Sequence, residues 1–153
     1  MTIASTLDIV EIGLGKPYLA VTMQIDYTKF KDLYLQTAQE YVDQLTQGIH
    51  SLSENISDLQ KIPSLHIAAH SLKGQSLAIG FPMVGRLSYI LEKVFYGVKG
   101  NTFTLSPDLV QLMQESVSKI EESLHSIAEN DKEVDLLQEI EKLEAVSGIK
   151  SVT

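Results

Sequence analysis

Apolar residues recur along most of this chain at alternating steps of three and four positions, the spacing that lines one face of an α-helix. Five such stretches can be traced, at about residues 26–52, 63–79, 82–98, 106–128 and 131–148. The second and third are the most regular, with seams at Leu65, Ala69, Leu72, Ser76 and Ile79, and at Val84, Leu87, Leu91, Val94 and Val98. The pattern predicts an all-α protein: an up-and-down four-helix bundle with an additional C-terminal helix and an irregular N-terminal arm.

Capping residues and helix breakers set the expected boundaries. Asp26 is expected to cap the first helix, whose seam runs through Phe30, Leu33, Tyr34, Tyr41, Leu45, Ile49 and Leu52. Ahead of it, two glycines and Pro17 interrupt any helix, and residues 20–25 form a short strand, a linker or a packed arm. We therefore divide the chain into an N-terminal arm at 1–26, a bundle at 27–130, and a C-terminal helix with its tail at 131–153.

The segment Gly80-Phe81-Pro82 predicts a tight hairpin between the second and third helices. Glycine commonly follows the last turn of a helix, and proline favours the first turn of the next one. In an antiparallel hairpin, residues equidistant from Phe81 lie at the same height. This rule pairs His70 with Glu92, Lys73 with Tyr89, and His66 with Tyr96.

Chemistry is concentrated around His70. Lys73 and Gly74 follow it at three and four positions, so the three residues share one stripe of a helix. Glycine inside a helix costs roughly 1 kcal/mol relative to alanine, so Gly74 needs a reason: either access for a partner or a tight helix contact. A carboxylate from Glu92 that accepts the Nδ1–H bond of His70 would leave the Nε2 lone pair free to attack phosphorus.

The sequence His70-Ser71-Leu72-Lys73-Gly74, with Glu92 on the next helix, resembles the histidine-containing phosphotransfer (HPt) domains of two-component phosphorelays. It is most similar to the N-terminal phosphotransfer domain of chemotaxis-type histidine kinases, over about residues 27–128. The resemblance implies that His70 is phosphorylated, with Lys73 offsetting phosphoryl charge and Glu92 orienting the ring. The residues expected to contact a partner are His66, Gly74, Gln75, Leu77 and Tyr89. Two of them depart from the family: Tyr89 stands where a second histidine is common, and Gln75 where a small residue is usual.

The charge distribution divides the chain. Its net charge is −8, yet residues 61–100 carry five basic side chains against the single acid Glu92. This hairpin is therefore +4 and the remainder −12, an arrangement that would attract a carboxylate-rich partner pocket. The overall acidity argues against nucleic acid as a partner. An alternative function is a non-catalytic interaction module that recognises its partner through the basic hairpin alone.

These features predict a phosphorelay carrier that exchanges a phosphoryl group with a histidine kinase ATP-binding domain and a receiver-domain aspartate. We expect no cofactor on the chain itself, with Mg²⁺ supplied by the partner, and no ATP-binding site. His66 with His70, and Glu122 with His125, have metal-ligand spacing, but neither set is complete. The absence of cysteine, of a roughly 20-residue apolar run and of a basic N-terminal region predicts a cytoplasmic protein without a membrane span. The chain is either free-standing or one domain of a larger kinase.

Overall fold

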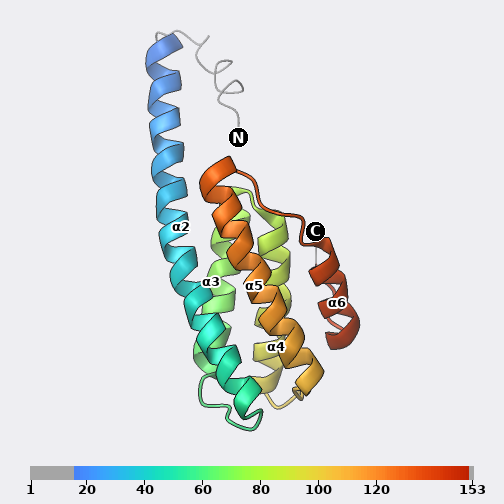
Figure 1. The fold of residues 1–153 in the computed structure, drawn as a ribbon. Helices are drawn as coiled ribbons and strands as arrows, with labels where there is room; N and C mark the ends of the chain where they lie inside the picture. Colours follow the sequence, from blue (N-terminus) through green and yellow to red (C-terminus); the bar gives the residue numbers. More distant parts are fainter. Residues whose placement is uncertain (1–15, 152–153) are drawn as a thin grey trace.

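The computed structural model describes residues 16–151, and the side chains from Tyr27 onward. The described helices are α2 (Lys16–Glu54), α3 (Ile62–Ile79), α4 (Pro82–Lys99), α5 (Pro107–Asn130) and α6 (Leu137–Ser147). The first four of these run up and down as a bundle, and α6 lies against α4 and α5 (Figure 1). The predicted all-α bundle with an additional C-terminal helix is confirmed.

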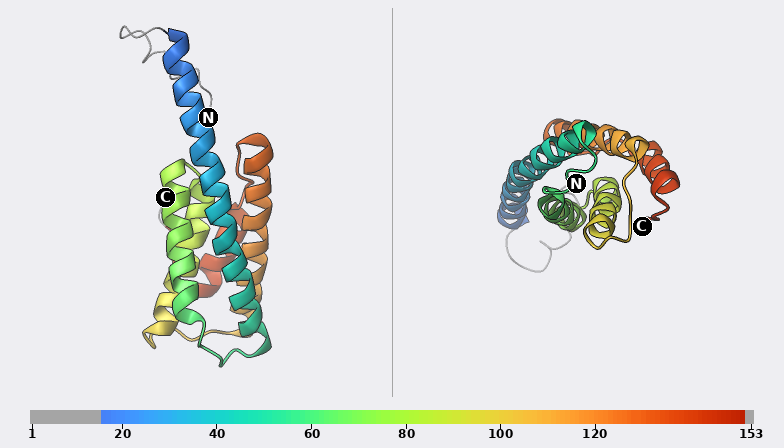
Figure 2. Two further views of the ribbon diagram at one scale, coloured as in Figure 1. Left: turned by 90° about the vertical axis from the view of Figure 1, so that its left-hand side faces the viewer. Right: turned by 90° about the horizontal axis from the view of Figure 1, so that it is seen from below.

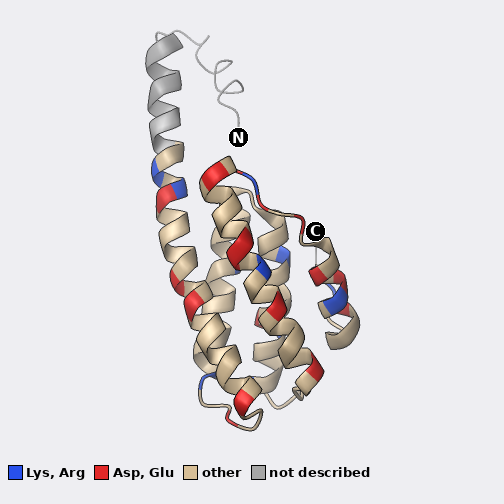
Figure 3. Ribbon diagram, in the orientation of Figure 1, with Lys and Arg blue, Asp and Glu red and all other residues tan. Residues whose placement is uncertain are grey.

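Seen end-on, α2, α5 and α6 form an outer arc around the α3–α4 hairpin, and no described helix lies over one long side of the hairpin (Figure 2). Acidic residues are spread over the helices of the arc (Figure 3). The arc therefore carries most of the negative charge of the described helices, while the uncovered side of the hairpin faces outward.

The first helix starts earlier than predicted. α2 begins at Lys16, so the start at Asp26 was wrong, and residues 20–25 are helical rather than a strand or linker. Proline is tolerated in the first helical turn, where its missing N–H has no intrahelical acceptor, and Pro17 occupies that turn. The result is a helix of 39 residues whose N-terminal end projects past the bundle (Figure 1). The remainder of the predicted arm, residues 1–15, lies outside the described part of the chain.

The hairpin between α3 and α4 forms as predicted. Gly80 ends α3 with a left-handed φ of 100°, which glycine adopts without a side-chain penalty. Its N–H bonds the carbonyls of Ser76 and Leu77, and the N–H of Phe81 also bonds the carbonyl of Ser76. Pro82 then opens α4, so the chain reverses within two residues.

The core follows the predicted seams with one exception. Every seam residue of α4 is buried, and so are those of α3 apart from the half-buried Ile79. On α2, however, Phe30 and Leu33 are 62% and 56% exposed, because they flank an open groove beside the last turn of α3 over which no described residue lies. The buried stripe of α2 consists instead of Tyr34, Ala38, Val42, Leu45, Ile49 and Leu52.

The connection from α5 to α6 is a structural element in its own right. Ser106 caps α5 as predicted, accepting the N–H of Leu109 at 3.1 Å. The C-terminal helix starts later than expected, at Leu137, because the preceding residues run irregularly across the end of the bundle. Within this stretch the Glu133 carboxylate accepts the N–H groups of Met83 and Val84 at 3.1 and 2.9 Å. Glu133 thereby caps α4, whose first N–H groups have no partner inside the helix.

Candidate functional site

The hairpin brings His70 and Glu92 into contact. The imidazole Nδ1 lies 2.8 Å from Oε1 of Glu92. The other carboxylate oxygen, Oε2, lies 2.7 Å from Nζ of Lys73. The His70 side chain is 62% exposed, whereas that of Glu92 is only 8% exposed. A buried carboxylate thus sits beneath an exposed imidazole, in the register that the count from Phe81 predicts.

The charge state of Glu92 follows from its surroundings. Burial acts to raise the pKa of this carboxyl, but the hydrogen bonds from Lys73 and His70, together with their positive charge, lower it below its ordinary value. Glu92 is therefore ionised near neutral pH and can only accept hydrogen bonds. In the neutral imidazole this places the proton on Nδ1 and leaves Nε2 with its lone pair free.

Lys73 has two neighbours, one of which the hairpin count predicts. Its ammonium forms an ion pair with Glu92, which the sequence did not predict, and its expected task of offsetting charge on the phosphoryl oxygens stays a prediction. The ammonium also lies 5.8 Å from the centre of the Tyr89 ring, the residue that the hairpin count places opposite it. Lys73 therefore reaches His70 through the shared carboxylate.

Aromatic rings surround this group. The ring of His66 lies 5.7 Å from that of Tyr96 and 6.4 Å from that of His70, centre to centre. Burial lowers the pKa of His66, and the nearby positive charge of Lys99 adds to that effect against the opposing charge of Glu92. His66 thus remains neutral at pH 7 and lies beside the His70 imidazole, opposite Tyr96 as the hairpin count predicts.

Gly74 lies on an open surface. A side-chain carbon added at this position would meet no atom within 4 Å, which excludes the tight helix contact considered above. Leu77, one turn further along α3, is exposed and covers Gly85 of α4. Ile67, one turn before His70, is exposed as well, and the sequence analysis missed it because it lies off the core seam. These residues form a shallow apolar surface on either side of His70.

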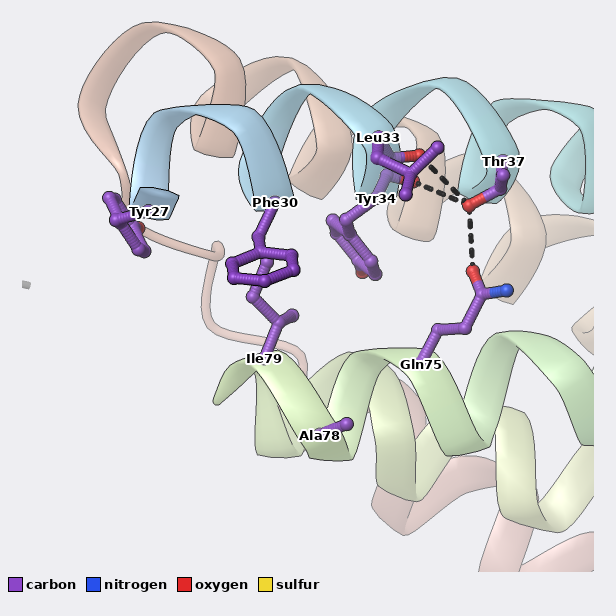
Figure 4. A pocket seen from close by; sticks show the side chains of 8 residues that line it. All are labelled: Tyr27, Phe30, Leu33, Tyr34, Thr37, Gln75, Ala78 and Ile79. Atoms are coloured by element: carbon purple, nitrogen blue, oxygen red, sulfur yellow. Dashed lines mark hydrogen bonds between the residues drawn. The ribbon is translucent and has the colours of Figure 1, made fainter. Parts of the chain in front are cut away.

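Gln75 marks the boundary between this surface and a groove of about 550 Å³ between α2 and α3 (Figure 4). Its amide oxygen accepts the hydroxyl of Thr37 at 2.8 Å. The deeper wall of the groove holds Tyr34, whose hydroxyl is 2.8 Å from that of Ser76 and whose pKa burial raises to about 12. His70 does not line the groove and lies on an open face instead.

Between residues 16 and 151, no group of three or more His, Cys, Asp or Glu side chains is arranged to hold a metal ion. Over the same part of the chain, no helix combines the length and apolar character needed to cross a bilayer.

Comparison with known proteins agrees with the geometry. The family model described as the Hpt domain matches residues 29–146. The chain belongs to the Hpt domain family. Hpt domains are phosphotransfer carriers rather than catalytic domains by themselves, so this chain has a phosphotransfer role in two-component signalling, as the sequence predicts. The match extends past residue 128 and includes most of α6, which the sequence analysis placed outside the resemblance.

Individual relatives of this Hpt domain are chemotaxis kinases. It is 23% identical to the chemotaxis protein CheA of Bacillus subtilis over 67% of its length, and 28% identical to CheA of Borreliella burgdorferi over the same share. It is 23% identical to the sensor histidine kinase CheAY of Helicobacter pylori over 84% of its length. In each case the chain spans only a small part of the relative: 15%, 12% and 16%, respectively.

Proposed function

We propose that His70 carries the phosphoryl group on Nε2. The observation that supports this most strongly is the 2.8 Å contact between its Nδ1 and the buried carboxylate of Glu92. This contact holds the proton on the nitrogen that faces the protein, and the nucleophilic nitrogen faces solvent. An activated nucleophile needs a neighbouring group that fixes its protonation state, and Glu92 provides one.

The transfer proceeds by two displacements at phosphorus. The Nε2 lone pair forms a bond to the phosphorus of the donor, and the bond from phosphorus to the donor's leaving oxygen breaks. The ring, which keeps its Nδ1 proton, is now a cation, and the ionised Glu92 beside it stabilises that charge. A carboxylate oxygen of the acceptor aspartate then attacks phosphorus, the P–N bond breaks, and His70 returns to its neutral form.

Lys73 is assigned two tasks in this scheme. Its ion pair with Glu92 fixes the carboxylate in place and keeps it ionised. Its positive charge also lies near the phosphoryl oxygens that arrive at His70, since the two side chains meet at the same carboxylate. Because Glu92 partly neutralises Lys73, the partner must stabilise most of the negative charge of the transition state, and we expect it to do so with Mg²⁺.

The partners proposed are a histidine kinase ATP-binding domain and a receiver domain with an acceptor aspartate. The open face around Gly74, with His66, Gln75, Leu77 and Tyr89 around it, is where such a partner would dock. Phosphoryl transfer requires the two reacting atoms to approach within about 3–3.5 Å, so a flat, accessible surface beside the histidine is needed. The chain itself supplies no nucleotide site in this scheme, and we propose that it acts in the cytoplasm.

The test is label transfer from ATP-loaded kinases and from phosphorylated receivers to the wild-type chain, to His70→Gln and to His125→Gln. His125 is an exposed histidine on α5, remote from the hairpin, and provides a matched control. Acid-labile phosphate is expected on the wild type and on His125→Gln, and none on His70→Gln. Label retained by His70→Gln would contradict the assignment. Receiver binding without any label on the wild type would favour the alternative, an interaction module that acts through the basic hairpin.

A further inference from the structure

Three residues of α4 form a ladder, of which the docking face proposed above includes only Tyr89. Tyr89, Lys93 and Tyr96 follow one another at four and three positions, so they occupy one helix face. The Lys93 ammonium lies 5.5 Å from the centre of the Tyr89 ring and 5.7 Å from that of Tyr96. Both distances are within the range of cation–π attraction. We refer to these three residues as the Tyr-Lys-Tyr ladder.

The ladder adjoins the site at both ends. Tyr89 also lies below the ammonium of Lys73, and Tyr96 packs against the ring of His66. A partner that covers His70 from the open side of the hairpin would therefore meet the ladder in the same approach.

Lys93 is a cation without an acidic partner. Lys73 pairs with Glu92, whereas Lys93 forms no ion pair with any residue in the described part of the chain. Its two rings hold the ammonium at the surface and leave its charge uncompensated. Tyr96 itself is 61% exposed, so its ring is accessible from outside the chain. An uncompensated cation held between the half-buried Tyr89 and the exposed Tyr96 is suited to receive an anionic group from outside the chain.

Building on the proposed function, we propose that the Tyr-Lys-Tyr ladder docks the carboxylate rim of the receiver pocket. A pocket that binds Mg²⁺ beside its acceptor aspartate must itself contain carboxylates, because oxygen ligands are what Mg²⁺ takes. The triphosphate of a kinase domain, in contrast, is largely neutralised by the cations of its own site. Lys93 therefore favours the receiver half of the relay over the kinase half.

In this role Lys93 determines which partner is preferred. Its charge should act mainly on the rate at which chain and receiver associate. Charges at the rim of an interface change the association rate and its salt dependence more than the tightness of the final complex. The effect of Lys93 on the association rate should become smaller at higher ionic strength, because salt screens its charge.

The experiment compares wild type with Lys93→Gln, Lys93→Arg and Tyr96→Leu, and uses Lys142→Gln on α6 as a control for net charge. Two rates are measured: phosphorylation of His70 by a kinase ATP-binding domain, and transfer from phosphorylated His70 to a Mg²⁺-loaded receiver. The receiver is the one from the source genome that accepts phosphate fastest from the wild type. Binding of the unphosphorylated chain to the same receiver is measured in parallel, so that docking is read separately from chemistry.

We expect Lys93→Gln to lower kcat/KM for transfer to the receiver about fivefold at low ionic strength and less than about twofold at 0.5 M salt. Receiver binding should weaken in parallel, Lys93→Arg should restore both, and Tyr96→Leu should have a smaller effect. Phosphorylation by the kinase should stay within about twofold of wild type. An equal loss in both half-reactions, or a loss no larger than that of Lys142→Gln, would overturn the assignment to the receiver. Failure of the wild type to take up label would instead overturn the proposed function, while the binding data would still test the ladder.

Discussion

At the scale of single residues, the site depends on one buried carboxylate with two partners. Glu92 faces His70 with one oxygen and Lys73 with the other, at 2.8 and 2.7 Å. Burial of an unpaired carboxylate would be destabilising, so the contacts with His70 and Lys73 together stabilise the charged Glu92 in its buried position. The exposed imidazole contributes little to the core, and its replacement should leave the fold intact. The orientation of the His70 ring, however, depends on the Glu92 carboxylate beneath it.

Replacement of Glu92 by glutamine tests this dependence. The amide keeps the shape of the side chain but removes the charge that stabilises the phosphorylated ring, and it leaves Lys73 without an anion. We expect phosphoryl transfer to slow by about 10²-fold, in line with the usual contribution of such a positioned group, while the far-UV circular dichroism stays unchanged. Lys73→Met should slow transfer less, because Glu92 still contacts His70. A rate for Glu92→Gln equal to that of the wild type would show that the carboxylate has no part in transfer.

Two carboxylates should give pH dependences of stability with opposite signs. The pKa of Glu92 is lowered in the fold from its ordinary 4.5, chiefly by hydrogen bonds that outweigh its burial, so its stabilisation is present above pH 4.5 and is lost as pH falls further. Burial raises the pKa of Glu133 above 4.5 despite the two N–H groups it accepts, so its effect on stability is favourable at low pH and declines as pH rises through the raised value.

Urea unfolding between about pH 3 and pH 7 checks both signs. The stability of Glu92→Gln relative to wild type should fall as pH rises, and that of Glu133→Gln should increase. Identical pH slopes for the two variants would contradict the assigned environments of the carboxylates.

At the scale of elements, the α3–α4 hairpin was predictable because its geometry is local. A glycine stop, a proline start and the helical repeat determine which residues face each other across a two-residue reversal. That is why the pairs His70 with Glu92 and Lys73 with Tyr89 could be read from the count to Phe81. The start of α2 could not be read in this way, since Pro17 is compatible both with a helix start and with an irregular arm.

Glycines within helices give a prediction at this scale, since helical propensity and packing act in opposite directions. Gly74→Ala should raise the free energy of unfolding by about 1 kcal/mol, because alanine favours the helix and the added carbon meets open space. Gly48→Ala should instead lower it by about 1–3 kcal/mol, since its new carbon would overlap Cδ2 of the buried Leu65.

The Gly74→Ala variant should nevertheless transfer phosphate severalfold more slowly if a partner closes over this surface. Thermal unfolding and transfer rates measured on the same samples separate the two effects. A Gly74→Ala chain that is more stable and equally fast would remove Gly74 from the docking surface.

At the scale of the whole molecule, α6 is joined to the bundle more closely than the division at residue 130 suggests. Leu136, Ile140 and Leu143 are fully buried against the bundle. Glu133, in the connection that leads to α6, caps the helix that carries Glu92. The C-terminal segment therefore supports the position of the site, although it contributes no residue to it.

Truncation tests the predicted boundary. A chain that ends at Asn130 loses three buried side chains, each worth about 1.5–3 kcal/mol, which is a large part of the stability of a typical domain. We expect this chain to unfold at a much lower temperature than a chain that ends at Gly148 and retains α6. Equal unfolding temperatures would show that residues 27–130 are sufficient for the bundle, as the sequence analysis assumed.

The sequence by itself determined the helical class, the hairpin, and the meeting of His70 and Glu92. These features arise from periodicity and turn chemistry, which act over a few residues and leave few alternatives. Only the tertiary structure decided which apolar stripe of α2 is buried, that Lys73 pairs with Glu92, and that Lys93 lies between two rings with no acidic partner among the described residues. Burial and pairing depend on what other elements place nearby, and a one-dimensional pattern does not contain that information.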